Sequence, residues 1–297
     1  MARRCIAGSR ILITGASQGI GRALAVEAAA QGAKVLAAAR NEGLLRELAD
    51  KVHRRGGIIA TVAADVTRAE DRARMVEAAG RTYGGLDILI NNAGIGATGH
   101  FAEVGPARLR QIMEVNFFGL TETTRACLPL LRQGVRPAVV NISSVAGKRG
   151  IPARSEYSAS KFAVQGFSEA LRAELDKDGI DVLVICPGLT QTNFSQNMIE
   201  QKARLPLDHL RGMTAEAVAR RTLRAVARGR HETVLTLQGK LIALVSRFLP
   251  RLADRIAARR VRELFREEIA ARHPSGGRKP PELRPAEIGR VQAQPQQ

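Results

Sequence analysis

The chain has 297 residues, of which 45% are hydrophobic and 25% charged, and it carries a net charge of +18. A chain of this length can bury one substantial core, and length alone allows one domain or two. Aromatic residues make up only 3% of the chain and Trp is absent, so a platform that stacks nucleic-acid bases is not expected.

The positive charge is concentrated toward the C-terminus, where residues 201–297 hold 21 Lys and Arg against 9 Asp and Glu. Such an excess attracts polyanions in general, and it fits an acidic membrane surface better than a nucleic acid. No apolar run reaches 18 residues, so a membrane-spanning helix is not expected.

Two features of the sequence favour the cytoplasm. Residues 1–6 are basic but lack the apolar segment of a signal peptide. Cys5, Cys127 and Cys186 are scattered without a close pair, which suits a reducing compartment and forms no zinc motif. We therefore predict a cytoplasmic protein and leave peripheral membrane association open.

A glycine-rich turn lies between a predicted strand and a predicted helix. Residues 10–14 are a short apolar run, and residues 23–30 favour a helix. Between them small residues let the backbone approach a pyrophosphate at the positive end of the helix, although the spacing is GxxxGxG and not the commoner GxGxxG. The predicted cofactor-binding residues of this turn are Gly15, Ser17, Gln18, Gly19, Ile20 and Gly21.

The second predicted strand, residues 33–39, ends without an acidic residue and is followed by Arg40. In dinucleotide-binding folds an acid at this place binds the ribose 2′-hydroxyl, whereas an arginine suits a 2′-phosphate. The cofactor is therefore predicted to be NADP(H) rather than NAD. Gln18 weakens this prediction, because a second basic residue in the glycine turn would have supported it.

The next two strands each end in polar residues. A helix over residues 42–55 leads to a third strand, residues 58–64, which is followed by Asp65 and Val66. Asp65 either accepts a hydrogen bond from an adenine amino group or caps the helix that starts near residue 67, and the sequence leaves both roles open. A fourth strand, residues 86–90, is followed by the predicted cofactor-binding residues Asn92, Ala93 and Gly94.

A long helix is predicted over residues 106–131, and it contains Asn116. An asparagine buried inside a helix needs hydrogen-bond partners. We expect Asn116 either to bridge a defect in the backbone or to hold a water molecule.

Ser144, Tyr157 and Lys161 are the candidate catalytic group. Ser144 follows a fifth strand, residues 138–142, and the two other residues lie four apart on a helix over residues 155–177, hence on one face. A free tyrosine has a pKa of about 10, and a neighbouring cation favours the phenolate. Ser144 can then hold a substrate oxygen while Tyr157 donates or accepts a proton, which is general acid–base chemistry on a carbonyl or alcohol.

Strands alternate with helices through a sixth strand at residues 180–186, which predicts a parallel sheet with right-handed crossovers. In such sheets ligands bind beyond the carboxyl ends of the strands. We expect one crevice to collect the residues that follow the six strands, namely Gly15, Arg40, Asp65, Asn92, Ser144 and Pro187.

The motifs at Gly15, Asn92, Asn116, Ser144 and Tyr157, in this order within residues 9–193, resemble those of the classical short-chain dehydrogenases/reductases. The resemblance implies an α/β fold, a Rossmann-type doubly wound parallel sheet of about seven strands with helices on both faces. It implies that the last strand lies near residues 232–237.

The resemblance also implies the roles of individual residues. Tyr157 would be the acid or base, Lys161 would lower its pKa and bind the nicotinamide ribose, Ser144 would orient the substrate oxygen and Asn116 would hold a proton-relay water. Ser143 is the rival serine, and the 13-residue separation from Tyr157 favours Ser144. The segment expected to hold the nicotinamide carboxamide contains Pro187, Gly188, Thr190 and Thr192.

By the same resemblance no metal is needed, because a nicotinamide cofactor carries the hydride. We expect a homo-oligomer, dimer or tetramer, and a small-molecule carbonyl/alcohol pair as substrate and product, with an apolar ketone or aldehyde reduced in the cell. The alternative hypothesis is a cofactor-binding regulatory or scaffold protein with this fold and no turnover.

Beyond residue 194 the resemblance weakens. Residues 195–213 are interpreted as a mobile lid and residues 214–228 as a helix. Residues 1–237 are predicted to form the Rossmann-type domain, residues 238–272 a basic amphipathic helical extension that Pro250 kinks or restarts, and residues 273–297 a disordered tail. The extension either lies in a membrane interface, which would suit a lipid- or steroid-like ketone, or packs on its own domain or a second subunit.

Overall fold

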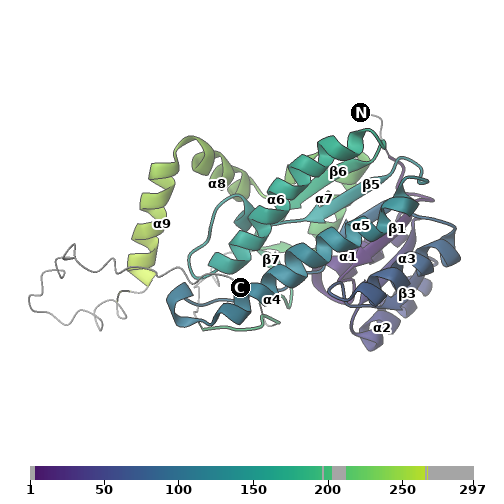
Figure 1. Ribbon diagram of the computed structural model, residues 1–297, viewed down its shortest axis with the longest axis horizontal. Coiled ribbons are helices and arrows are strands. Elements are labelled where there is room, and N and C mark those ends of the chain that lie inside the picture. Colours follow the sequence, from purple (N-terminus) through teal and green to yellow (C-terminus); the bar gives the residue numbers. More distant parts are fainter. Residues whose placement is uncertain (1–3, 196, 203–211, 265, 267–297) are drawn as a thin grey trace, which may run out of the picture.

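The computed structural model describes residues 4–195, 197–202, 212–264 and 266. Within this part of the chain, seven parallel strands form one sheet with helices on both faces (Figure 1). The strand order is β3-β2-β1-β4-β5-β6-β9, which is the doubly wound arrangement predicted from the sequence.

The strands of the sheet are β1 (Arg10–Thr14), β2 (Lys34–Ala39), β3 (Ile58–Ala63), β4 (Ile88–Asn91), β5 (Ala138–Ile142), β6 (Asp181–Cys186) and β9 (Glu232–Val234). A separate short pair consists of β7 (Thr190–Gln191) and β8 (Met213–Thr214). The helices are α1 (Gly19–Ala30), α2 (Glu42–His53), α3 (Ala69–Tyr83), α4 (Pro106–Met113), α5 (Gly119–Leu131), α6 (Ser155–Asp176), α7 (Ala215–Ala227), α8 (Leu237–Phe248) and α9 (Pro250–Leu264).

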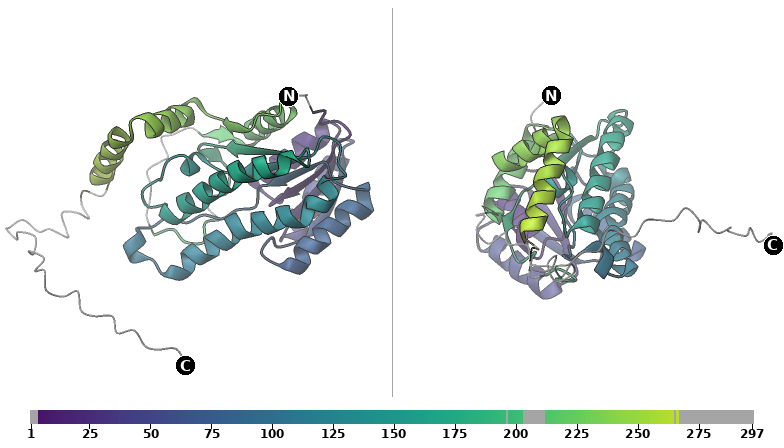
Figure 2. Two further views of the ribbon diagram at one scale, coloured as in Figure 1. Left: turned by 45° about the horizontal axis from the view of Figure 1, so that its top comes forward. Right: turned by 90° about the vertical axis from the view of Figure 1, so that its left-hand side faces the viewer.

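Two apolar layers hold the sheet between the helices (Figure 2). One layer packs α1, α2 and α7 on one face of the sheet, and the other packs α3, α5 and α6 on the opposite face. The central strands β4 and β5 are buried along their whole length, as parallel strands covered on both faces must be. The chain reverses its direction of winding between β1 and β4, and this is where a ligand crevice is expected.

The structure differs from the sequence prediction at two places. The last sheet strand ends at Val234, and Leu237 already begins α8. The helix predicted over residues 106–131 is interrupted by one π-helical turn, η2 (Glu114–Phe118), which joins α4 to α5. Part of the predicted lid, residues 196 and 203–211, and the predicted tail at 273–297 lie outside the described residues.

The C-terminal helices α8 and α9 form an arm that projects beyond the sheet and its covering helices (Figures 1 and 2). Pro250 is the first residue of α9, so it restarts the helix as predicted. The arm is attached where Gly239 packs against Val145 of η3 (Val145–Gly147) and where Arg149 Nη2 binds Asp254 Oδ1 at 2.7 Å. No helix in the described residues is both long and apolar enough to cross a membrane.

Candidate active site

One cleft of about 1200 Å³ opens at the carboxyl ends of the strands. The six residues expected to meet there all line it, because parallel strands end at the same edge of the sheet. Of the predicted site residues, those that line the cleft are Gly15, Ser17, Gln18, Gly19, Ile20, Arg40, Asp65, Val66, Asn92, Ala93, Gly94, Ser144, Tyr157, Lys161, Pro187, Gly188, Thr190 and Thr192. The two remaining predicted residues, Gly21 and Asn116, are buried and do not line the cleft.

The glycine turn between β1 and α1 forms one end of the cleft. Gly15 and Gly19 have φ angles of +64° and +55°, which glycine adopts without strain. A Cβ on Gly21 would lie 2.3 Å from the carbonyl oxygen of Gly15, so only glycine allows this close approach. Asn92 Nδ2 donates to the carbonyl oxygens of Thr14 and Gly15 at 3.0 and 3.1 Å, which fixes the turn against the loop after β4.

The glycine turn fits a dinucleotide pyrophosphate. No described side chain caps the N-terminus of α1, and its first turn holds no acidic residue, so its free N–H groups and positive helix end favour an anion. Gln18, the residue that precedes the helix, instead accepts a hydrogen bond from Asn197 Nδ2 at 2.7 Å. The sequence did not predict this contact with the segment after β7.

Arg40 lies at the cleft edge beyond β2, and its side chain is 73% exposed. Its Nη1 is 3.9 Å from Asp65 Oδ2, a weak exposed ion pair. Asp65 Oδ1 accepts from the amide and hydroxyl of Thr67 at 2.9 and 2.8 Å. Asp65 therefore forms a turn ahead of α3 and faces the cleft, but it does not cap that helix, which begins at Ala69 with Arg68 at its N-cap and no side-chain cap. The predicted capping role is wrong, and the contact with an adenine amino group stays a prediction.

Ser144, Tyr157 and Lys161 meet at the opposite end of the cleft. Helix α6 carries Tyr157 and Lys161 on one face, and the Lys161 Nζ lies 5.8 Å from the centre of the Tyr157 ring. Lys161 is buried and donates to the carbonyl oxygen of Ile142 at 3.0 Å. The Ser144 hydroxyl accepts from the amide of Ala146 at 3.1 Å and lies close enough to the Tyr157 phenol to lower its pKa.

The electrostatics of this cluster differ from the expectation that Lys161 lowers the pKa of Tyr157. Burial raises the pKa of the Tyr157 phenol, and the effects that lower it come from the Ser144 hydroxyl and the Arg154 charge. Burial also lowers the pKa of Lys161 to about 8, because water no longer solvates its ammonium. At neutral pH the phenol is therefore protonated.

Ser143, the rival serine, uses its hydroxyl for hydrogen bonds within the protein interior. Its hydroxyl donates to the carbonyl oxygen of Lys161 at 3.1 Å and accepts from Gln165 Nε2 at 3.1 Å. The Ser144 hydroxyl, in contrast, reaches the Tyr157 phenol. The geometry thus favours Ser144 as the serine that faces a substrate.

Asn116 lies in the π-helical turn and is fully buried. Its Oδ1 accepts from the amide of Ile95 at 2.8 Å, and its Nδ2 donates to the carbonyl oxygen of Ile95 and to Ser160 Oγ, both at 3.0 Å. These bonds join the loop after β4 to the helix that carries Tyr157. Asn116 lies in an irregular turn, but its side chain binds Ile95 and Ser160 and not the backbone of that turn, so its two predicted roles stay predictions. Turns of the π type are frequent at functional sites.

The segment after β6 closes the cleft beside the catalytic cluster. A Cβ on Gly188 would lie 2.9 Å from the hydroxyl of Thr236, so this glycine is held close to the start of α8. Thr190 Oγ1 donates to the carbonyl oxygen of Gly188 at 3.1 Å, and Thr192 packs against Gly19 of the glycine turn. The two ends of the cleft are therefore joined through this segment.

Sequence reasoning missed part of the wall next to Tyr157. The Phe194 ring lies 5.8 Å from the Tyr157 ring, centre to centre, and Ile151, Arg154 and Ile242 also line this part. Arg154 lies three residues before Tyr157 but precedes α6, so no helical spacing pointed to it. Ile242 belongs to α8, and packing of this extension on its own domain was one of the alternatives considered from the sequence, but without the residues that make the contact.

The arrangement combines a nucleotide-binding cradle with a proton donor and a second hydroxyl at a common point. Within the part of the chain that the structure describes, no group of three or more His, Cys, Asp or Glu side chains is suited to hold a metal ion. A protonated phenol beside a serine hydroxyl can donate a proton and a hydrogen bond to the same oxygen atom.

These features assign the chain to the oxidoreductases that act with a nicotinamide dinucleotide. A family model described as short chain dehydrogenase matches residues 9–203, and the protein belongs to the short-chain dehydrogenase/reductase family. The resemblance noted from the motifs is thus confirmed.

Similar proteins come from distant organisms. The uncharacterized oxidoreductase YxnA of Bacillus subtilis (strain 168) is 38% identical over 251 residues, which cover 83% of this chain and 70% of the relative. Dehydrogenase/reductase SDR family member 7B of Rattus norvegicus is 37% identical over 264 residues, covering 85% of this chain and 81% of the relative. A short chain dehydrogenase/reductase from Burkholderia phymatum, crystallised in complex with NAD, superposes with a TM-score of 0.77 at 26% identity, covering 84% of this chain and 96% of that one.

Proposed function

We propose that this protein transfers a hydride between NADP(H) and a carbonyl or alcohol, and that it works as a reductase of apolar ketones or aldehydes. The observation that carries the proposal is the shared cleft, with the glycine turn at one end and Ser144, Tyr157 and Lys161 at the other. When bound, the cofactor supplies or accepts the hydride. The chain supplies the cradle, the orientation and the proton.

The residues of the cluster have distinct roles in the proposed reduction. The Tyr157 phenol donates its proton to the carbonyl oxygen of the substrate, and the Ser144 hydroxyl donates a hydrogen bond to the same oxygen. The raised pKa of Tyr157 supports this direction, because it keeps the phenol protonated at neutral pH. Lys161 binds the nicotinamide ribose, and Asn116 fixes the loop against which the cofactor lies.

NADP(H) is proposed as the cofactor because β2 ends without an acidic residue and Arg40 lies at the cleft edge. Asn41, the next residue, uses its side chain to accept from the amide of Leu44 at 3.0 Å and so caps α2. The solved relative from Burkholderia phymatum holds NAD, so the preference has to be measured. We expect wild-type protein to bind NADPH more tightly than NADH in a fluorescence titration, and Arg40→Asp to reverse the order; an unchanged order would contradict the role of Arg40.

The apolar substrate class is supported by the wall beyond Tyr157. Its side chains there are mainly hydrophobic, namely Ile95, Ile151, Leu189, Phe194, Met198, Met213 and Ile242. A panel of ketones and aldehydes of increasing chain length, with each reduced cofactor, tests the function by loss of absorbance. Tight NADPH binding without oxidation by any member of the panel would instead favour a regulatory or scaffold protein.

We propose that copies of the chain associate through the long helices. Phe118, at the junction to α5, and Phe162, on α6, are both about half exposed in the monomer, which is unusual for large apolar rings. A dimer or tetramer that covers them would explain this exposure. Light scattering tests the proposal: the wild type should be a dimer or tetramer, and Phe118→Asp should dissociate. The proposal is wrong if both proteins are monomers.

We further propose that the arm of α8 and α9 lies on an anionic lipid surface on the cytoplasmic side of a membrane. Four apolar side chains repeat along α8 at i, i+4, i+7 and i+11 and form one outward stripe of Leu237, Leu241, Leu244 and Phe248. Leu237 is 83% and Phe248 68% exposed. A stripe of this kind, unpartnered in the monomer, is typical of helices that lie in a membrane interface.

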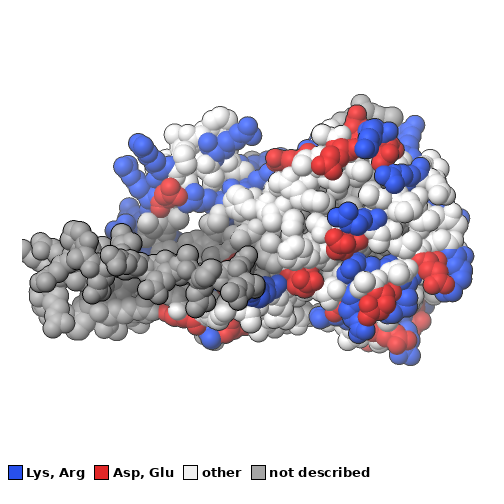
Figure 3. All heavy atoms as spheres, in the orientation of Figure 1, with Lys and Arg blue, Asp and Glu red and all other residues white. Residues whose placement is uncertain are grey.

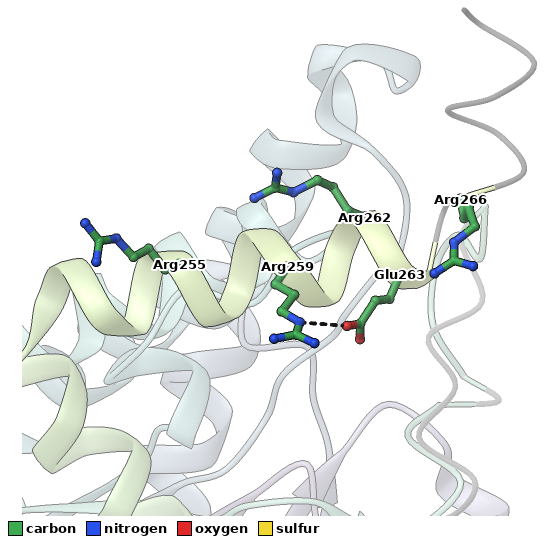
Figure 4. Close-up of a pocket in the computed structure, with 5 residues that line it drawn as sticks. All are labelled: Arg255, Arg259, Arg262, Glu263 and Arg266. Carbon is green, nitrogen blue, oxygen red and sulfur yellow. Dashed lines mark hydrogen bonds and ion pairs between the residues drawn. The ribbon is translucent and has the colours of Figure 1, made fainter. Parts of the chain in front are cut away.

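The charge of the arm complements an anionic bilayer. Residues 237–264 with Arg266 contain eight Lys and Arg and two acids, Asp254 and Glu263, and Figure 3 shows basic side chains among uncharged atoms over this segment. Figure 4 shows Arg259 paired with Glu263, at 3.0 Å, while Arg255 and Arg262 point away from that carboxylate. Each basic side chain near an anionic leaflet contributes roughly 1 kcal/mol of attraction.

This placement supports the substrate class, because Gln238 and Ile242 of the same helix line the cleft. Flotation with vesicles of phosphatidylcholine plus phosphatidylglycerol, and with phosphatidylcholine alone, tests the arm. Wild type should float with the anionic vesicles, and Leu241→Asp should not. If the variant floats equally, or if it only splits a dimer in light scattering, the stripe does not bind lipid.

A further inference from the structure

Arg154 is a cation on the cleft wall whose side chain makes no hydrogen bond or ion pair within the part of the chain that the structure describes. It lines the cleft three residues before Tyr157, and its Nε atom is buried without a hydrogen-bond acceptor. Its guanidinium forms no ion pair with any residue of the described chain. A buried donor left without an acceptor is costly, so an unpaired arginine beside a catalytic residue calls for an explanation.

Glu156, the acid nearest to Arg154 in the sequence, is already paired with another arginine. Glu156, two residues further on, binds Arg108 in a two-point contact, with Arg108 Nε to Oε1 at 3.1 Å and Nη2 to Oε2 at 2.6 Å. Arg108 Nη1 also binds Glu200 at 3.0 Å, and Glu200 in turn binds Lys202 at 2.7 Å. These pairs leave Arg154 as the cation whose charge is free to meet a ligand.

The backbone holds Arg154 firmly in this place. Ala153 adopts a φ of +58°, a left-handed conformation that costs free energy for a residue with a Cβ. The carbonyl oxygen of Ala153 accepts from the amide of Gly99 at 2.9 Å, and the Arg154 amide donates to the carbonyl oxygen of Ile151 at 3.0 Å. Strain retained at the start of the catalytic helix is consistent with a functional position.

Arg154 and Tyr157 lie close enough to influence each other. Arg154 directly precedes α6 and Tyr157 lies in the first turn of that helix; both line the cleft, and the Arg154 charge lowers the pKa of the Tyr157 phenol against the effect of burial. A group bound by Arg154 would therefore lie only a few bonds from a carbonyl whose oxygen contacts Tyr157.

We propose that Arg154 binds an anionic group of the substrate, a carboxylate or a phosphate, a few bonds from the reacting carbonyl. Arginine suits both groups because its planar fork donates two parallel hydrogen bonds. The rest of the substrate lies along the apolar wall that contains Ile151 and Phe194. The inference rests on the proposed function, and it narrows the proposed substrate class from apolar ketones to amphiphilic ketones that carry an anionic group.

The test compares matched charged and neutral ketones. We use 3-oxooctanoate with its methyl ester, and 1-hydroxyoctan-2-one phosphate with free 1-hydroxyoctan-2-one. Arg154→Gln should lower kcat/KM for one anionic ketone by roughly 10- to 100-fold, mainly through KM, because a charge-assisted contact is lost. Neutral partners should change less than about threefold, and Arg154→Lys should retain part of the preference. The anionic ketone that loses the most identifies the group as carboxylate or phosphate.

Arg149→Gln is the matched control, since Arg149 pairs with Asp254 outside the cleft and should leave both members of each pair unchanged. Equal losses for the charged and neutral ketones would overturn the proposal, because Arg154 would then act through Tyr157 or the fold. Unchanged kinetics for both anionic ketones would overturn it as well.

A binding measurement separates this proposal from the proposed function. Calorimetry of 3-oxooctanoate and of the phosphate ketone with NADP⁺-saturated protein should show weaker binding to Arg154→Gln of at least one of them. Arg154-dependent binding without turnover would support the anion site and contradict the reductase. Turnover of neutral ketones without Arg154-dependent binding of either anion would support the reductase and overturn the site.

Discussion

The catalytic body and the α8–α9 arm use the same kinds of residues in opposite ways. In the body, large side chains such as Leu24 and Leu89 are fully buried, whereas Leu241 and Phe248 of the arm are more than half exposed. Burying such a side chain contributes roughly 1.5–3 kcal/mol to stability. The body therefore uses its apolar residues to hold itself together, whereas those of the arm are left exposed.

Charged residues show the same contrast. Arg10 and Arg108 of the body are paired with Asp87 and Glu156, at 2.7 and 2.6 Å, on side chains that are largely buried. In the arm, basic residues outnumber acids and are exposed. Changes in the body should therefore affect folding and catalysis, and changes to the exposed residues of the arm that do not line the cleft should affect association alone.

The largest effect is expected at Tyr157. Tyr157→Phe removes the proposed proton donor and keeps the ring, so turnover should fall by roughly 10²- to 10⁴-fold while cofactor affinity stays within about threefold. Single-turnover absorbance and a fluorescence titration measure the two quantities. Leu241→Asp in the arm should retain wild-type turnover of a soluble ketone. Substantial activity in Tyr157→Phe would mean that another group moves the proton.

Next in size is the stability contrast between two leucines. Leu89→Ala opens a cavity in the central strand β4 and should cost about 2–5 kcal/mol of unfolding free energy. Leu241→Ala, on the exposed stripe, should change it by less than about 0.5 kcal/mol. Urea unfolding of both variants without lipid checks the difference, and a comparable loss in both would show that the stripe is covered in solution.

Much of the body was predictable, because the elements repeat local patterns. The strand predicted at residues 138–142 coincides with β5, and the helix predicted from residue 155 begins there. Because the strands are parallel, their carboxyl ends lie at one edge of the sheet, and this brings the cleft residues together. The start of α8 at Leu237 was misjudged, because Val234, Leu235 and Leu237 read as a continuation of the strand, whereas Thr236 accepts from the amide of Gly239 and caps the helix.

Pairings between residues that lie far apart in the chain could not be predicted from the sequence. The partner of Glu156 is Arg108, 48 residues away, and only that pairing leaves Arg154 unmatched in the cleft. Likewise, the sequence suggested that Lys161 lowers the pKa of Tyr157. That inference omitted the burial that raises the phenol's pKa and lowers that of the ammonium. Desolvation depends on the packed surroundings, which a spacing pattern does not contain.

The buried ammonium of Lys161 predicts a pH dependence of the body's stability. Folding lowers the pKa of this group from 10.5 to about 8, so between these values the unfolded chain binds more protons than the folded one. The group's penalty to stability is therefore full below pH 8 and is relieved as the pH rises to 10.5, by about 3 kcal/mol in total. Across this window the free energy of unfolding of the wild type, measured with urea, should rise relative to that of Lys161→Met. A constant difference between the two would contradict the lowered pKa.

Replacing two helical glycines of the body by alanine should change stability by smaller amounts, with opposite signs. A Cβ on Gly21 would meet the backbone of Gly15, whereas one on Gly166 of α6 would meet nothing within 4 Å. Gly21→Ala should therefore cost about 1–3 kcal/mol and weaken dinucleotide binding. Gly166→Ala should stabilise by about 0.5–1 kcal/mol, because alanine is the better helix former. Thermal unfolding with and without NADPH measures both, and stabilisation by Gly21→Ala would show that the turn is not closely packed.

The smallest effect is expected where the body holds the arm. Arg149 and Asp254 form an ion pair that is partly exposed, with 25% and 69% of their side chains accessible, so removing it should change global stability by less than about 1 kcal/mol. Its consequence should be local: in Asp254→Asn the amides of α9 should exchange faster with deuterium, while those of β4 and β5 stay protected. If exchange rises in the sheet as well, the arm and the body unfold together and the contrast between them is wrong. If exchange rises in α9 alone, the arm has its own low opening free energy, as a segment that binds an external surface would need.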